Sequence, residues 1–449
     1  MNQDVKTPFP PIPAFIINLK KRDDRRQHAL AQFAGKPEFT PVIVEAREHA
    51  SGAVGLWDTI LEILSSRAEQ ASEYVLICED DHLFTENYSP ELLHTCIIEA
   101  RERQADILVG GPSWFENAFH ASDNLFWVEK FTGFQFVVVF RKFIPQILEA
   151  DFGTGNVADL FISRLTDAKF FIAPFVSVQQ SFGYSDVTSR NDTPGRVDEL
   201  YVNAIAKVNI LDTVAGFFRN AAVQPEVAGT IDLATVVLPV YILSTPGAAD
   251  KEGQILKEFE GRREFTIATH EWSACDNTAD WGRLCSIVRM AVEKEEDVIV
   301  VCYDDHRFTP AYSAHTFVRQ VIRAYQYGGG LLCGSINGFS QVLPLADDGF
   351  WTDQVTGSRF IVIYHSAFQA ILDEAFNPEL TLEAMLSEMI SNKMVVYPFI
   401  SLQENSPEEK PEAKGGSPAG RDKYETCRQR LEKANKASQV YGSPVRRAV

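Results

Sequence analysis

Cysteine is scarce in this 449-residue chain and is not arranged for a zinc site or a disulfide framework. The seven cysteines are an odd number, and no two of them form a C-x-x-C pair. Disulfide scaffolds and structural zinc sites need paired or closely spaced cysteines. We therefore expect buried or idle thiols and a protein of a reducing, cytoplasmic compartment.

Long hydrophobic runs are also missing. No uninterrupted apolar stretch approaches the roughly 20 residues that a membrane-spanning helix needs. The opening residues, MNQDVKTPFPPIPAF, contain no basic segment that leads into an apolar run and no small-residue cleavage site. The sequence thus predicts neither a transmembrane segment nor a secretory signal.

Positive charge is in short supply over most of the chain. The formal net charge is −19, and residues 406–449 carry ten Lys/Arg against six Asp/Glu, so the remainder carries −23. Such an acidic body would repel phosphates and is unsuited to general nucleic-acid binding. A polyanionic ligand such as a diphosphate would need a cation to mediate its binding.

What the chain does contain is an acidic phrase that occurs twice. CEDDHLFTENYS at 78–89 and CYDDHRFTPAYS at 302–313 are separated by 224 positions. The same offset pairs Trp57 with Trp281 and needs no gap through residue 179. A period of this length predicts a duplicated domain rather than a solenoid.

Apolar strands alternate with amphipathic helices within the first copy. Short apolar runs predict strands at 14–19, 41–46 and 74–78, and helical spacing predicts helices at 54–68 and 90–103. This alternation is typical of a mostly parallel sheet that is flanked by helices. We therefore expect an α/β protein with two tandem Rossmann-like domains.

Composition divides the chain into four segments. We expect a first, catalytic domain at 12–190 and a helical linker at 191–234. A second domain should follow at 235–405, and the basic residues 406–449 should form a flexible tail, in which a short charged helix is possible.

Three carboxylates, Glu79, Asp80 and Asp81, follow directly on the predicted strand at 74–78. Open α/β sheets bind ligands at the carboxyl ends of their strands, and adjacent carboxylates repel one another unless a counter-charge is near. Oxygen ligands without His or Cys suit Mg²⁺ or Mn²⁺. Asp80 and Asp81 are the candidate metal ligands, and a solvated acidic turn is the alternative.

Five phrases occur in a fixed order in the first copy: FIINLKKRDDRR, ICEDDHLF, TGFQFVVV, GNVADLFI and VSVQQSFGYSDV. In this order they resemble glycosyltransferase family 25, which holds bacterial lipooligosaccharide galactosyltransferases and collagen galactosyltransferases. The resemblance covers most of the first copy and is faint in the second. It implies a GT-A-type fold, a UDP-sugar donor, Mn²⁺ or Mg²⁺, and inversion at the anomeric carbon. One departure is SGAVGLWDTI, which lacks the Cys, Ser and His of the family's corresponding segment.

The resemblance also implies roles for individual residues. Asp80 and Asp81 match the acidic motif that holds the metal and the donor ribose. The residues implied in donor binding are Asn18, Lys20, Arg25, Arg26, Glu79, Asp80 and Gln180. Asp159 matches the acidic residue of the P-x-D-x-F segment, and is a candidate base, a donor or acceptor contact, or a helix-start residue. Asp186, which belongs with Ser185 to the late phrase, is the competing base.

The second copy keeps the apolar framework and loses polar residues. Glu79 becomes Tyr303, Asp159 aligns with Glu383, and the paired arginines of the opening segment have no counterpart. We predict a degenerate second domain; the alternative is a second active site that uses Asp304, Asp305 and Glu383. Because the Asp-Asp-His run survives in both copies, His82 is expected to hydrogen-bond within its loop rather than to bind a metal.

A cluster of aromatic residues in the first copy allows two interpretations. Its members are Trp114, Phe115, Phe119, Phe126 and Trp127. Aromatic rings stack on sugar faces, so an acceptor platform is one interpretation and core packing is the other.

Taken together, the sequence predicts a metal-dependent glycosyltransferase that moves a hexose from a UDP-sugar to a glycan or peptide acceptor. The alternative from another class is a non-catalytic scaffold that binds nucleotide-sugars or glycans. A metal-dependent phosphoester hydrolase is a third possibility, but it would need more Asp, Glu or His ligands than the motifs supply. The retention of Arg25, Glu79 and Asp159 in the first copy favours the enzyme.

Overall fold

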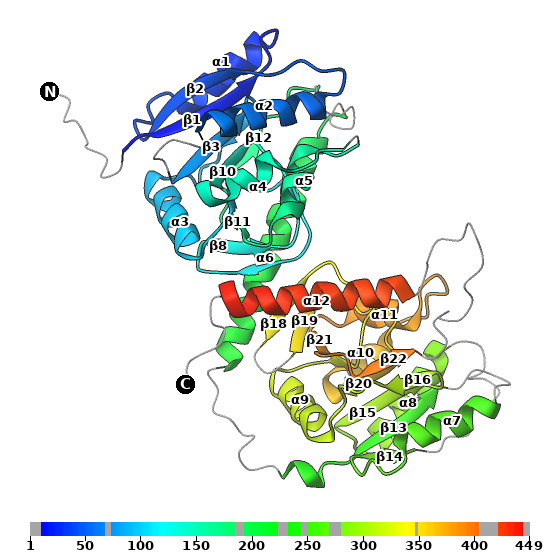
Figure 1. The fold of residues 1–449 in the computed structure, drawn as a ribbon. Coiled ribbons are helices and arrows are strands. Elements are labelled where there is room, and N and C mark those ends of the chain that lie inside the picture. Colours follow the sequence, from blue (N-terminus) through cyan, green and yellow to red (C-terminus); the bar gives the residue numbers. More distant parts are fainter. Residues whose placement is uncertain are drawn as a thin grey trace. The chain divides into compact units, whose positions relative to one another are not determined.

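The computed structural model describes residues 10–67, 73–153, 155–184, 193–222, 232–243, 249–268, 280–345, 349–403 and 421–442. The chain forms two compact units (Figure 1). Unit 1 comprises Met1–Val214 with Ala437–Ser443, and unit 2 comprises Ala215–Lys436 with Pro444–Val449. Each unit is an α/β structure built on an eight-stranded sheet, as the sequence predicts.

The sheet of unit 1 is mixed, although most of its strands run in one direction. In spatial order its strands are β2 (Phe39–Glu45), β1 (Ile12–Asn18), β3 (Tyr74–Glu79), β10 (Phe136–Phe140), β5 (Ile107–Val109), β11 (Lys169–Ile172), β8 (Leu125–Val128) and β7 (Ala118–His120). β10 and β8 run antiparallel to both of their neighbours. The parallel trio β2, β1 and β3 brings three strand ends to one edge.

The helices of unit 1 are α1 (Asp23–Phe33), α2 (Gly52–Arg67), α3 (Pro90–Glu102), α4 (Ile144–Leu148) and α5 (Ala158–Leu165). Two of them, α2 and α3, form where the apolar spacing predicts them. The start of α3 illustrates the local signals: Ser89 Oγ accepts a hydrogen bond from Leu92 N at 3.1 Å, and Pro90 occupies the first helical position. Helices α2, α4 and α5 pack against one another.

Two short ribbons complete unit 1. They pair β4 (His82–Phe84) with β12 (Ser177–Gln179), and β6 (Trp114–Phe115) with β9 (Phe131–Thr132). The first of these ribbons places His82, which directly follows the acidic residues, opposite Gln179.

The sheet of unit 2 repeats the strand order of unit 1. Its strands are β14 (Phe265–Ile267), β13 (Leu238–Leu243), β15 (Val298–Tyr303), β20 (Phe360–Tyr364), β17 (Leu331–Cys333), β21 (Lys393–Val396), β19 (Gly349–Thr352) and β18 (Val342–Leu345). A ribbon of β16 (His306–Phe308) and β22 (Ser401–Gln403) stands beside it. The helices are α7 (Ala249–Phe259), α8 (Asp280–Glu293), α9 (Ala314–Gln326), α10 (His365–Asp373) and α11 (Leu382–Met389).

A buried histidine bond recurs in both units at the offset of 224. His82 Nδ1 lies 2.8 Å from Ser177 Oγ, and His306 Nδ1 lies 2.8 Å from Ser401 Oγ. Both imidazoles are fully buried. His82 therefore makes a hydrogen bond, as the sequence comparison predicts, but the bond joins the paired strands β4 and β12 rather than residues of one loop.

Helix α6 (Arg196–Ala222) is more than the linker expected at 191–234. Its residues Tyr201 and Leu211 are buried. Lys207 Nζ donates to Phe115 O at 3.1 Å, so the first half of α6 is an integral part of unit 1.

Helix α12 (Arg421–Tyr441) corrects the expectation of a flexible tail for its own residues, while 406–420 and 443–449 lie outside the described residues. Cys427, Leu431 and Ala434 belong to the buried core of unit 2. These apolar residues were not recognised in the sequence because charged residues surround them. Cys427 is one of six cysteines that the structure describes, all of which are buried and outside any disulfide among the described residues.

Candidate functional site

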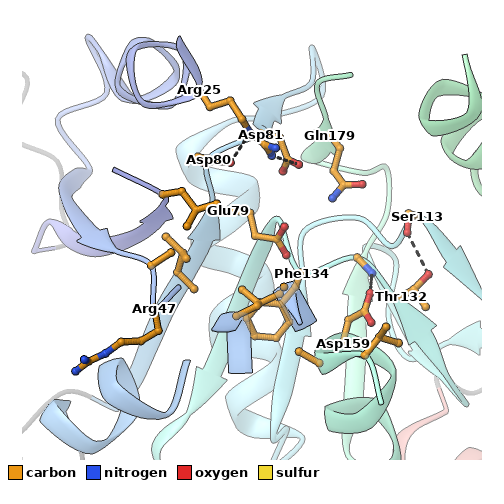
Figure 2. A pocket seen from close by; sticks show the side chains of 18 of the residues that line it. Arg25, Arg47, Glu79, Asp80, Asp81, Ser113, Thr132, Phe134, Asp159 and Gln179 are labelled. Carbon is orange, nitrogen blue, oxygen red and sulfur yellow. Dashed lines mark hydrogen bonds and ion pairs between the residues drawn. The ribbon is translucent and has the colours of Figure 1, made fainter. Parts of the chain in front are cut away.

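A cavity of about 340 Å³ opens at the edge where β1, β2 and β3 end (Figure 2). Because these strands are parallel, the segments that follow them meet at this edge. The polar residues that line the cavity are Lys21, Arg25, Arg47, Glu48, His49, Glu79, Asp80, Asp81, Ser113, Thr132, Asp159 and Gln179.

Arg25 is the cation at the centre of the acidic motif. From the first turns of α1 its Nε lies 2.7 Å from Asp80 Oδ1, and its Nη2 lies 2.6 Å from Asp81 Oδ2. Asn18 Nδ2 donates to the other oxygen of Asp80 at 2.8 Å. Both oxygens of Asp80 are thus engaged inside the protein.

Asp81 keeps one oxygen for another partner. Its Oδ1 is buried and has no hydrogen-bond partner in any other described residue. Burial raises the pKa of Asp81 to about 6, although the adjacent Arg25 lowers it. The free energy of this site would therefore fall if a further cation approached Asp81.

Glu79 is the third carboxylate of the motif and extends into the same cavity as Asp159 (Figure 2). Burial raises the pKa of Glu79 well above its usual range, and the neighbouring Asp81 and Asp159 raise it further. The cavity wall thus gathers more negative than positive charge.

Asp159 is held firmly by the backbone at the start of α5. Its Oδ2 accepts a hydrogen bond from Gly133 N at 2.8 Å, and its Oδ1 accepts one from Leu160 N at 2.6 Å. Gly133 has φ +108°, which favours glycine. Burial raises the pKa of Asp159, although these two hydrogen bonds lower it. Asp159 is therefore a helix-start residue that also faces the cavity.

Tyr201 of α6 adds a buried hydroxyl that the sequence did not indicate. Burial raises the pKa of this phenol well above its usual range, and the charges of Asp81, Glu79 and Asp159 raise it further. The hydroxyl is therefore neutral, and the charges of the three carboxylates act on it.

The donor set is compatible with a divalent cation, but not through the predicted pair. The described residues contain no group of three or more His, Cys, Asp or Glu side chains arranged to hold a metal. Mg²⁺ in nucleotide sites commonly takes one or two carboxylates and completes its shell with phosphate oxygens and water. Asp81 Oδ1 and Glu79 fit that pattern, whereas Asp80 is occupied by Arg25 and Asn18.

Three residues of the predicted donor site do not line this cavity. The side chain of Lys20 is 80% exposed and lies 4.0 Å from Glu45. Arg26 is exposed on the outer face of α1. Gln180 is exposed too, but it lines a second pocket together with Arg25 and Asp81. Its neighbour Gln179 lines both this pocket and the cavity. Asp186 and Ser185 lie outside the described residues.

The segment that follows β2 contributes to the cavity, although no motif in the sequence indicated it. Arg47, Glu48 and His49 line the cavity, and Arg47 Nε lies 2.7 Å from Glu62 Oε2. A signal was present, since this segment follows a predicted strand, and that strand lies parallel in the same sheet as the strand before the acidic motif, with β1 between them.

The aromatic cluster belongs to the hydrophobic core of unit 1 and does not form a platform for an acceptor. Phe115, Phe119, Phe126 and Trp127 are buried, and only Trp114 of the five is substantially exposed, at 39%. Trp127 Nε1 donates to Asp167 O at 2.8 Å, which fixes its ring inside unit 1.

Comparison with known proteins assigns no family. No family model matches the chain, and no curated protein does. Among solved structures, A197 from STIV is 14% identical over 39% of this chain and 87% of that chain, with a TM-score of 0.27. UDP-glucose pyrophosphorylase, apo and with UDP-glucose, is 11% identical over 44% of this chain and 81% of that chain, with a TM-score of 0.25.

Similarity at this level carries no argument about function, so any functional conclusion depends on the site itself. In addition, the described helices include none with the length and apolar character of a membrane span.

Proposed function

We propose that unit 1 is a metal-dependent glycosyltransferase domain that moves a hexose from a UDP-sugar to a glycan or peptide acceptor. One observation carries the proposal. Residues from three separate motifs of the glycosyltransferase resemblance, namely Arg25, Asp81 and Asp159, meet at one cavity, although they are far apart in the sequence.

The cavity has the size and the charges that a sugar nucleotide requires. Its volume of about 340 Å³ lies within the range of small-molecule sites, roughly 300–1,000 Å³. Lys21 and Arg47 line the wall and would attract the diphosphate, while the carboxylates would repel it. A diphosphate therefore needs a further cation on the carboxylate side.

Asp81 and Glu79 would hold that cation, Mn²⁺ or Mg²⁺. When bound, it would supply neutralisation of the charge that develops on the departing diphosphate. Arg25 keeps Asp81 in place for this role, and it compensates Asp80, which the cation would not contact.

The transfer itself needs a base. The acceptor hydroxyl oxygen forms a bond to the anomeric carbon, the bond from that carbon to the diphosphate oxygen breaks with inversion, and the hydroxyl proton passes to a carboxylate. Asp159 is the base we propose, because two backbone N–H groups fix its orientation toward the cavity. Burial raises its pKa, which favours proton acceptance near neutral pH.

The experiment is a calorimetric titration of UDP into the full chain with and without Mn²⁺. We expect UDP to bind only with Mn²⁺ and the affinity to fall at least tenfold in Asp81→Asn. Asp305→Asn, at the equivalent position of unit 2, is the matched control and should leave the affinity unchanged. Equal UDP affinities of Asp81→Asn and the wild type would overturn the proposal.

A further inference from the structure

One position differs in charge between two otherwise equivalent sites. In unit 1 the backbone N–H of Glu79 donates to Gln135 O at 3.2 Å, and in unit 2 that of Tyr303 donates to Arg359 O at 3.0 Å. Gln135 and Arg359 are thus equivalent in three dimensions as well as in sequence, each at the residue before the central antiparallel strand.

The two side chains take different directions. Gln135 is fully buried, and its Nε2 donates to Gly111 O at 2.5 Å, so its amide is bound to the backbone. Arg359 instead extends over the ring of Tyr303, with its guanidinium carbon 4.7 Å from the ring centroid.

Arg359 reaches both carboxylates of unit 2. Its Nε lies 3.5 Å from Asp305 Oδ1, and its Nη1 lies 3.9 Å from Glu383 Oε1. Asp305 and Glu383 are the equivalents of Asp81 and Asp159. In unit 2 the guanidinium of Arg359 therefore contacts both acidic groups whose equivalents in unit 1 face the open cavity.

We infer that Arg359, which pairs with both Asp305 and Glu383, is a built-in cation that closes the site of unit 2 to a divalent metal ion. In unit 1 Arg25 pairs with Asp81 Oδ2, and Gln135 at the position of Arg359 leaves Asp81 Oδ1 and Asp159 open to such an ion. The inference rests on the proposed function for the part that concerns unit 1. A divalent ion near Asp305 would meet the like charge of Arg359, and it would have to displace the ion pairs that Arg359 makes.

The test is the number of Mn²⁺ ions bound per chain, counted by electron paramagnetic resonance of free Mn²⁺. We expect one ion in the wild type and two in Arg359→Gln. The variant Arg428→Gln removes an exposed arginine, whose Nη2 lies 2.7 Å from Glu425 on α12, and it should bind as many ions as the wild type.

A second readout is thermal unfolding. Arg359→Gln leaves Asp305 and Glu383 without their cation, so its melting temperature should fall without Mn²⁺ and recover when Mn²⁺ is added. If this variant does not fold, Arg359→Gln/Glu383→Gln removes one of the released carboxylates and is measured in the same way. The reciprocal Gln135→Arg should lose the ion of unit 1.

The outcomes separate the two proposals. A wild type that binds no Mn²⁺ contradicts the proposed function, whereas the increment between the wild type and the folded Arg359 variant decides this inference alone. No additional ion in that variant, or two ions already in the wild type, would overturn it.

Discussion

Removing Arg25 should destabilise unit 1 more than removing any exposed arginine. The side chains of Arg25, Asp80 and Asp81 are only 9%, 10% and 14% exposed, and Arg25 pairs with both carboxylates at 2.6–2.7 Å. Arg25→Met keeps much of the side-chain volume but leaves two buried carboxylates without their cation. Breaking a buried ion pair from one side costs about 3–5 kcal/mol.

The consequence can be measured as a shift in melting temperature. For a unit of this size, each kcal/mol lowers the melting temperature by roughly 2–4 °C, so Arg25→Met should melt roughly 6–20 °C below the wild type. The assay is differential scanning calorimetry of the full chain without added metal. Arg26→Met, one residue further along α1 and exposed, is the matched control and should change stability by less than about 0.5 kcal/mol.

A double-mutant cycle sharpens the interpretation. Arg25→Met/Asp81→Asn removes one of the stranded charges, so it should be more stable than Arg25→Met alone, with a coupling energy in the range of roughly 0.5–3 kcal/mol. If Arg25→Met melts within 2 °C of Arg26→Met, or if the double variant shows no coupling, the reasoning about the buried charges is refuted.

Three further predictions follow from individual contacts. Burial lowers the pKa of His82 and His306 to about 3. Because the unfolded histidine binds its proton near pH 6.5, the neutral buried imidazole costs no stability above about pH 6.5. Below pH 6.5 the free energy of unfolding declines by about 1.4 kcal/mol per pH unit for each residue. Urea unfolding between pH 6 and pH 4 should therefore show a smaller slope against pH in His82→Gln, and an unchanged slope would contradict the assignment. Gly110→Ala should cost roughly 1–3 kcal/mol in the same assay, because the new Cβ would lie 2.8 Å from the ring of Phe136; a neutral effect would show that the packing is looser than described. Asp159→Asn should fold normally and lose about 10²–10⁴-fold in turnover if Asp159 is the base, whereas a loss below tenfold in a UDP-release assay would exclude that role.

Periodicity in the sequence was sufficient to predict several strands and helices of unit 1. The apolar runs before residues 19, 46 and 78 became β1, β2 and β3, and the helices at 54–68 and 90–103 appeared with small shifts at their ends. The offset of 224 predicted two similar units, and their sheets do share one strand order.

Strand direction could not be predicted in the same way. The run FQFVVVF has the apolar composition of any buried strand, yet β10 runs antiparallel between β3 and β5. Which way a buried strand runs depends on long-range pairing, and a local apolar pattern does not encode it.

The site was predicted at the level of motifs and missed at the level of single side chains. The motif with Arg25 and Arg26 offered two arginines, and only the helical rotation between them decides that Arg25 faces the acidic residues. Gln179 and Gln180 pose a similar problem, since β12 ends at Gln179 and only this residue lines the cavity. The role of Tyr201 depends on α6 packing against unit 1, which a helical pattern alone does not reveal.

The most direct measurement is the release of UDP from a panel of UDP-hexoses by the wild type and by Asp81→Asn, with and without Mn²⁺. The account predicts that at least one UDP-hexose is turned over, that turnover requires Mn²⁺, and that Asp81→Asn abolishes it. If no UDP-hexose is consumed with Mn²⁺ present, or if Asp81→Asn is as active as the wild type, the proposed role of the cavity is contradicted.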